Sequence, residues 1–248
     1  PLMVGVVALT VIAVVVTAVA VRFHWGPGGA IFQLFGAGAC LSLPATASTF
    51  GAVIGIGLGA VLFSLVVTTV LSVRRIRARD VFAPIDPVSL GTASAEVLLT
   101  TGIGVFLAST VAAVLVHGHW YWATVAAVAA VTGKDLHARL ARGTLRFLGT
   151  AVGVALAACL FALQPPLLVL ILIACLCQGA IELLVMRNYG LAMMLITVIA
   201  LTMVHLASPE APGALAFDRL VETTIGVVIG SLVTIGSSVV LARLKPAD

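Results

Sequence analysis

The stretch STFGAVIGIGLGAVLFSLVVTTVLSV, residues 48–73, contains no Asp, Glu, Lys or Arg and is followed directly by Arg74 and Arg75. A helix needs about 20 consecutive apolar residues to cross the hydrocarbon core of a bilayer. This stretch is therefore long enough to span a membrane, and it ends in positive charge. It predicts that the chain is embedded in a lipid bilayer.

Uncharged stretches of this kind fill most of the chain; they are residues 1–21, 23–73, 97–133, 147–181, 188–209 and 223–242. Only 9% of the 248 residues are charged, against about 25% in a typical soluble domain. This composition excludes an ordinary soluble globule, a disordered chain and a nucleic-acid-binding protein. The net charge of +4 therefore needs a membrane explanation, with lipid as a partner.

We predict an all-α, polytopic transmembrane bundle of about nine hydrophobic segments: 2–21, 28–43, 48–73, 94–116, 120–133, 145–163, 167–186, 189–207 and 218–242. Segment 120–133 is too short to cross about 30 Å of hydrocarbon at 1.5 Å per residue, and 28–43 is also short. Short spans in two halves are typical of transporter binding sites, but they also arise from simple hairpin packing. Both explanations stay open at this point.

Basic residues predict the orientation, because positive charge concentrates on the cytoplasmic side of a membrane protein. When Arg74 and Arg75 are placed in the cytoplasm and the spans alternate, twelve of the thirteen basic residues fall on that side. Arg219 alone falls at an outer end. The C-terminus is then cytoplasmic, and His119 falls in an outer, solvated loop.

A repeated motif indicates internal duplication. TFGAVIG at 49–55 matches TIGVVIG at 224–230, and a weaker copy, GTAVG, occupies 149–153. Arg142 and Arg219 each precede the first glycine of their copy by seven residues. Glycines spaced in this way let helix backbones approach closely in lipid. We therefore expect three-helix repeats.

The predicted orientation makes the units 94–163 and 167–242 an inverted pair. The resulting organisation is a first membrane unit at 1–73, a short basic cytoplasmic linker at 74–93, a six-helix membrane domain at 94–242 and a cytoplasmic tail at 243–248. If the protein consists of two six-helix halves, three helices of the first half are missing from this chain.

Four short motifs resemble the fusaric acid resistance and aromatic acid exporter family, whose fold is shared with plant aluminium-activated malate transporters. They are WxWAT at 120–124, RLARGTLRFLGTAVG at 139–153, RNYGLA at 187–192 and RLVETTIG at 219–226. The resemblance covers about residues 94–242. It implies an inner-membrane exporter or channel for organic, often aromatic, carboxylates. The chain departs from fuller members because only about 20 residues stand where they have a large cytoplasmic domain.

The motifs of common enzymes and motors are absent from the sequence. It contains no phosphate-binding loop, nucleophile elbow or zinc-protease pair. No spacing of Cys, His or carboxylates predicts a metal site. We therefore expect no catalytic residues, no cofactor and no enzyme activity, and any active transport would draw on an ion gradient or another subunit.

Candidate substrate-binding residues are the basic and aromatic ones at the ends of the short spans. Arg139, Arg142 and Arg146 form one helical stripe that would attract a cytoplasmic anion or anchor to anionic headgroups. Arg142 and Arg219 occupy the same repeat position, and arginine suits carboxylates because its guanidinium binds both oxygens. The tryptophans would stack on an aromatic substrate or lie in an interfacial belt; they are Trp120 and Trp122.

Ionisable groups within apolar segments are costly and therefore candidates for function. Glu182 and Glu222 are the candidates for proton coupling. The alternative for Glu182 is an ion pair with Arg187, and for Glu222 an ion pair with Arg219.

The leading prediction is a secondary exporter of small organic, including aromatic, carboxylates, driven by an ion gradient. The alternatives are a non-transporting scaffold subunit of a larger complex and a passive anion channel. We expect a homodimer or a partner membrane subunit.

Overall fold

The computed structural model describes residues 2–25, 30–42, 46–76, 91–116, 118–207 and 211–244. Every regular element within these residues is an α-helix, which confirms the predicted all-α bundle. In chain order the helices are α1 (Leu2–Arg22), α2 (Ile31–Ser42), α3 (Ala47–Ile76), α4 (Thr92–Leu115), α5 (Tyr121–Val131), α6 (Leu136–Ala162), α7 (Leu167–Leu184), α8 (Tyr189–Ala207) and α9 (Pro212–Leu244).

Seven of these helices are long and apolar enough to cross a membrane: α1, α3, α4, α6, α7, α8 and α9. Helices α2 and α5 are shorter, as the sequence predicts for segments 28–43 and 120–133. Because a bilayer core requires about 20 apolar residues per crossing, the chain is a multi-pass helical membrane protein.

Two helices begin earlier than the apolar segments alone predict. α6 starts at Leu136 rather than residue 145, because Asp135 caps it: its Oδ1 accepts a hydrogen bond from the Ala138 backbone N–H at 2.8 Å. α9 starts at Pro212 rather than 218, since proline fits the first position of a helix. The arginines at 139–146 therefore lie inside a helix.

Helix α5 lies at the centre of the bundle. All of its residues are buried, and it packs against α9, α4, α6 and α2. Its sequence YWATVAAVAAV is rich in alanine, whose small side chain lets a neighbouring helix approach closely. A hydrogen bond of 2.7 Å between the hydroxyls of Ser109 and Thr124 joins it to α4.

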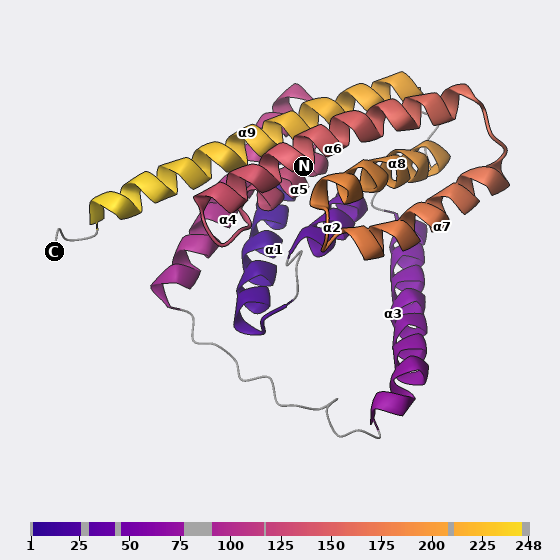
Figure 1. Cartoon of the computed structure of the whole chain (residues 1–248), viewed down its shortest axis with the longest axis horizontal. Coiled ribbons are helices and arrows are strands. Elements are labelled where there is room, and N and C mark those ends of the chain that lie inside the picture. The colour runs from indigo at the N-terminus through magenta and orange to yellow at the C-terminus, as the bar shows by residue number, and fades with distance from the viewer. Residues whose placement is uncertain are drawn as a thin grey trace.

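The two longest helices of the C-terminal part, α6 and α9, lie side by side and run in opposite directions (Figure 1). At their contact, a Cβ at Gly143 would lie 3.3 Å from a methyl of Val227 and 3.5 Å from the Ser231 hydroxyl. α6 also packs against α8, and α8 packs against α7. These helices and α5 enclose the site described below.

The N-terminal helices are placed differently. α1 packs against α4 and α2. α3 stands at the edge of the molecule (Figure 1), and none of its membrane-length apolar window is buried. The predicted linker 74–93 and tail 243–248 fall largely outside the described residues, which omit 77–90 and 245–248.

Candidate functional site

Helix α9 lies directly on α5 through two glycines. A Cβ at Gly226 would collide with the carbonyl oxygen of Ala123, and a Cβ at Gly230 would lie 2.8 Å from the carbonyl oxygen of Ala127. Real Cβ atoms do not come this close to backbone atoms. Glycine is therefore required at both positions for α9 to reach α5.

Helix α6 lies on α8 in the same manner. A Cβ at Gly149 would lie 2.7 Å from the carbonyl oxygen of Gly190, and one at Gly153 would lie 2.6 Å from that of Met194. Two pairs of helices are thus joined by backbone contact at glycines of the repeated motif.

About two helical turns before each glycine pair, an arginine covers an aromatic ring. The guanidinium carbon of Arg219 on α9 lies 4.6 Å from the centroid of the Trp122 ring at the start of α5. The guanidinium carbon of Arg142 on α6 lies 4.5 Å from the centroid of the Tyr189 ring at the start of α8. Both are cation–π contacts, which are stronger where water is excluded.

Constant offsets in residue number relate the two sets of contacts. One arginine and two glycines of α6 lie 77 positions before their counterparts in α9, and the residues of α5 that α9 contacts lie 67 positions before their counterparts in α8. The α6 and α9 counterparts are Arg142 and Arg219, Gly149 and Gly226, and Gly153 and Gly230. The α5 and α8 counterparts are Trp122 and Tyr189, Ala123 and Gly190, Ala126 and Met193, Ala127 and Met194, and Ala130 and Thr197.

A second arginine of α6 is buried next to these pairs. Arg146 is 3% exposed, and its Nη1 donates to the Tyr189 hydroxyl at 3.4 Å and to the Met193 sulfur at 3.6 Å. It lies within electrostatic range of Arg219. Two buried guanidinium groups, one from α6 and one from α9, are therefore near enough to repel each other electrostatically.

Glu222 is the carboxylate of this region, one helical turn after Arg219. Its side chain is 0% exposed, Arg219 is 1% exposed, and Trp122 is 0% exposed. Among the described residues, neither Glu222 oxygen accepts a side-chain hydrogen bond, and the Nε and Nη1 of Arg219 and the Nε of Arg146 have no hydrogen-bond partner. The ion pair considered for Arg219 and Glu222 is not formed among the described residues. We call Arg142, Arg146, Arg219 and Glu222 the arginine cluster.

The basic stripe predicted for 139–146 faces inward. Arg139 donates from Nη1 to Glu96 Oε1 at 3.1 Å and from Nε to the carbonyl oxygen of Gly133 at 3.2 Å. Arg139 and Arg146 are buried and Arg142 is half-buried. The stripe therefore lines the protein interior rather than a lipid-headgroup surface.

The tryptophans and His119 also lie inside the protein. Trp120 is 5% exposed and packs against α1 near Gly5, so neither tryptophan forms an interfacial belt. The expectation of a solvated loop for His119 is wrong. Its ring stacks on Trp122 with centroids 4.6 Å apart and planes at 16°, and its Nδ1 lies 4.0 Å from Asp218 Oδ2. Loop composition alone carries no signal for this stacking.

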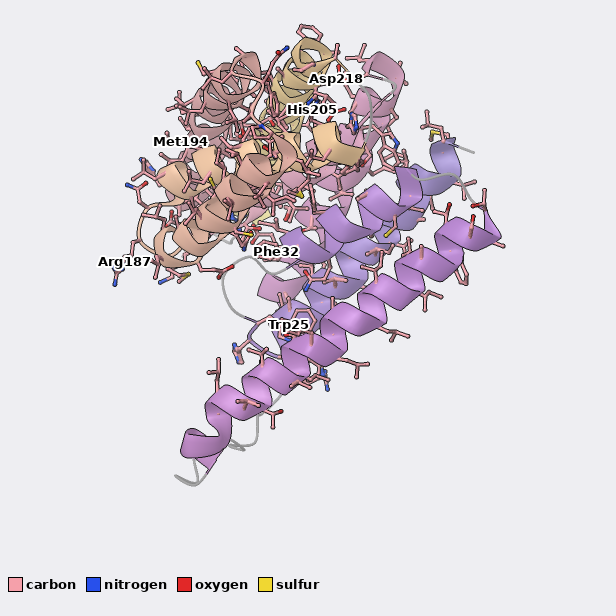
Figure 2. All side chains as sticks on the ribbon, turned by 90° about the vertical axis from the view of Figure 1, so that its right-hand side faces the viewer. Trp25, Phe32, Arg187, Met194, His205 and Asp218 are labelled. Atoms are coloured by element: carbon pink, nitrogen blue, oxygen red, sulfur yellow. The ribbon has the colours of Figure 1, made fainter. Side chains whose placement is uncertain are left out.

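Glu182 lies away from the arginine cluster. Its side chain is exposed on α7, and its Oε1 accepts a hydrogen bond from Gln178 Nε2 at 2.9 Å. Arg187 is exposed and directed away from the bundle (Figure 2), and it forms no ion pair with Glu182 among the described residues. Glu182 and Glu222 are both proton-coupling candidates from the sequence. The structure leaves Glu182 exposed and buries Glu222.

The arrangement suits the binding of an anion. Among the described residues, buried guanidinium N–H groups without hydrogen-bond partners come from both α6 and α9, and such groups are strong donors to a carboxylate. The residues of the arginine cluster nearest the centre are closed off from solvent, so a ligand reaches them only after the helices part. Among the described residues, no three His, Cys, Asp or Glu side chains are grouped to hold a metal ion.

Comparison with known proteins agrees with this architecture. The family model described as "Fusaric acid resistance protein-like" matches residues 90–233, which include α4 to α8 and most of α9. The chain is also similar to the uncharacterized membrane protein YvaC of Bacillus subtilis (strain 168), at 30% identity over 137 residues. That alignment covers 55% of this chain and 22% of YvaC, so the chain spans only a fraction of that relative. No solved structure matches. The matched region contains the glycine contacts and the whole arginine cluster, and the chain belongs to the fusaric acid resistance protein-like family.

Proposed function

We propose that the protein is a secondary transporter that exports small organic carboxylates, aromatic acids included, across the inner membrane. The observation that carries this proposal is the pair of buried arginines, Arg146 and Arg219, whose guanidinium groups keep unpartnered N–H donors in the protein interior. Burying such groups without partners is unfavourable. A carboxylate that pairs with them would remove that penalty.

Aromatic carboxylates fit the surroundings of these arginines. Trp122 and Tyr189 each present a ring beside a guanidinium group. A bound aromatic acid would place its carboxylate on the guanidinium groups and its ring against one of these side chains. Trp120 would hold the neighbouring Trp122 ring in position, since Trp120 packs the start of α5 against α1.

The transport path would run along the α6–α9 contact. Arg139 and Arg142 would receive the anion at the cytoplasmic end, Arg146 and Arg219 would hold it at the centre, and the outer end would open at His119 and Asp218. The repeated contacts of the two arginine–aromatic pairs support an inverted repeat, in which one pair opens while the other stays closed. The C-terminus of α9 would then lie in the cytoplasm.

The membrane potential favours export of an anion. An interior that is negative by 100 mV drives each negative charge outward with about 2.3 kcal/mol. Glu222 would make anion binding depend on pH, because a proton on this carboxylate leaves Arg219 uncompensated and strengthens anion binding. Glu182 is exposed on α7, away from the arginine cluster, and is therefore the matched control for Glu222.

Counterflow in proteoliposomes tests this function. Vesicles loaded with unlabelled benzoate, 4-hydroxybenzoate or fusaric acid should accumulate the labelled acid, with or without an imposed potential. The E222Q variant should lose the dependence of the rate on a proton gradient, whereas E182Q should keep it. Failure of every acid to exchange in purified wild-type protein would reject the transport function.

A scaffold subunit is the second candidate, and the exposed helix α3 favours it. Within the part of the chain that the structure describes, no other helix comes within 4 Å of a Cβ placed at Gly51, Gly55 or Gly59, although the matching glycines of α6 and α9 pack on other helices. A homodimer or a partner membrane subunit would cover this face. G55L should then reduce the particle mass measured in detergent, and an unchanged mass would reject this contact.

A passive anion channel is a third candidate. Steady current that needs no exchangeable anion on the opposite side would distinguish it from the carrier.

A further inference from the structure

Thr223 on α9 departs from the repeated contacts. Subtracting the offset of 77 gives it the repeat position of Arg146 on α6. In α6, the guanidinium group at this position donates a hydrogen bond to the hydroxyl of Tyr189 at 3.4 Å. In α9, the same position carries a short, neutral side chain. The polar atom of the aromatic residue on that side, the indole nitrogen of Trp122, therefore has a different environment.

Both polar atoms on the α9 side are buried without a partner. Trp122 and Thr223 are each 0% exposed. Within the described part of the chain, neither the indole N–H of Trp122 nor the hydroxyl of Thr223 forms a hydrogen bond. A buried indole N–H or hydroxyl group normally finds a partner, because leaving it unpaired is unfavourable. Two hydrogen-bond donors therefore remain available to a ligand at this position.

A threonine inside a helix can satisfy its hydroxyl group locally. Thr202 and Thr224 each do so by donating to the carbonyl oxygen four residues earlier, at 2.7 Å. Thr223 does not form this bond, although it precedes Thr224 directly. Thr150 and Thr234 are also buried without a hydroxyl partner among the described residues, but neither takes the repeat position of an arginine.

Helix geometry places Thr223 at the level of Trp122. The glycine contacts show that α5 and α9 run in the same direction. Thr223 lies four residues after Arg219 and three before Gly226, so all three share one face of α9. Arg219 covers the Trp122 ring, and Gly226 packs on the first turn of α5. Thr223 therefore faces the start of α5, beside the arginine–aromatic pair.

We propose that Thr223 and the indole N–H of Trp122 form a second subsite, which binds an acceptor oxygen on the ring of the transported acid. This inference rests on the proposed anion transport. The carboxylate pairs with Arg219, and a carbonyl or hydroxyl oxygen across the ring accepts hydrogen bonds from the indole N–H and the Thr223 hydroxyl. Arg219 and Thr223 are about 6 Å apart along the helix axis, a span that one benzene ring bridges. The subsite therefore selects aromatic carboxylates that carry such an oxygen.

Two ligands of the same shape isolate the contribution of one oxygen atom. In 4-acetylbenzoate a carbonyl oxygen stands where 4-isopropenylbenzoate has a methylene group. Binding of both acids to purified protein is measured for wild type, T223V, T223S, W122F and T224V. Wild-type protein should bind 4-acetylbenzoate about tenfold more tightly, since a site with buried donors disfavours a ligand that leaves them unpaired.

The variants should separate the Thr223 hydroxyl from its neighbours. T223V and W122F each remove one donor and should bring the ratio of the two affinities toward one. T223S keeps the hydroxyl and should keep the wild-type ratio. T224V is the matched control and should also keep it, because the Thr224 hydroxyl already donates to the carbonyl oxygen of Leu220.

Thermal unfolding without ligand gives a readout that a purely structural role of Thr223 would not reproduce. Valine has the shape of threonine without the unpaired hydroxyl, so T223V should melt at a higher temperature than wild type while losing the preference for the carbonyl oxygen. A lower melting temperature of T223V would show that the protein itself satisfies this hydroxyl, and would overturn the subsite.

The affinities can also overturn the subsite while leaving anion transport intact. Equal binding of the two acids by wild-type protein would do so, and so would a wild-type ratio in both T223V and W122F. Absence of binding and exchange of both acids and of benzoate in wild-type protein would instead reject the underlying function.

Discussion

Arg219 and Trp122 form a buried contact between two helices, with the guanidinium carbon 4.6 Å from the ring centroid. His119 stacks on the same indole, and both Arg219 and Trp122 are almost completely inaccessible to solvent. A long cationic side chain from α9 is thus positioned by an aromatic ring from the short helix α5. The same relationship joins Arg142 on α6 to Tyr189 on α8.

Substitution of Trp122 should separate ring stacking from simple burial. W122F keeps an aromatic face for Arg219 and should lower the free energy of unfolding by about 1 kcal/mol. W122L removes that face and should lower it further, although leucine is also apolar. Thermal unfolding in detergent measures both. Equal stability of W122F and W122L would contradict the cation–π contact.

We expect that lysine cannot take over the role of Arg142 or Arg219 in anion binding. The ammonium group has no planar face for Trp122 or Tyr189 and cannot bind both oxygens of a carboxylate. R219K should weaken benzoate binding by about tenfold, and R142K should weaken it less because Arg142 is half-buried. Equilibrium binding to purified protein provides the measurement, and wild-type affinity in R219K would refute direct recognition by the guanidinium group.

The glycine contacts give a prediction with a control in the same helix. G226A places a methyl group against the carbonyl oxygen of Ala123, so α9 must move away from α5. We expect a loss of about 1–3 kcal/mol of stability. G236A is also on α9, but among the described residues no neighbouring group lies within 4 Å of its Cβ position, so this variant should be at least as stable as wild-type protein. A similar melting temperature for both variants would show that the close contact is absent.

The Arg139–Glu96 ion pair should couple α6 to α4. Its N–O distance is 3.1 Å and its side chains are 9% and 24% exposed. A double-mutant cycle of R139Q and E96Q should yield about 1 kcal/mol of coupling. The cycle of R139Q with E182Q should yield none, because Glu182 lies on another surface. A coupling energy of zero between R139Q and E96Q would show that this ion pair does not join α6 to α4.

Much of the fold was predictable because membrane helices have a simple signature. The absence of charge over about 20 residues identifies the long spans, and the shortness of 120–133 correctly predicts the brief helix α5. The starts of α6 and α9 were less predictable. They depend on the capping side chain of Asp135 and on Pro212, which hydropathy does not detect.

The candidate site was only partly predictable. The spacing of Arg142 and Arg219 before their glycines indicated a shared role, and the structure gives both the same aromatic contact. Sequence could not distinguish Glu182 from Glu222, since both are acids in largely apolar helices. Their different burial depends on tertiary packing, because α7 exposes one face whereas α9 is enclosed by α5, α6 and α4. The stacking of His119 likewise requires the folded contact between α5 and α9.

The central claim is that buried arginines bind a carboxylate, and binding of labelled benzoate to purified protein tests it most directly. Wild-type protein should bind benzoate saturably, and R146Q and R219Q should each weaken that binding by about tenfold or more while remaining folded. Undiminished binding in both folded variants, or no saturable binding of benzoate or 4-hydroxybenzoate to wild-type protein, would contradict the account.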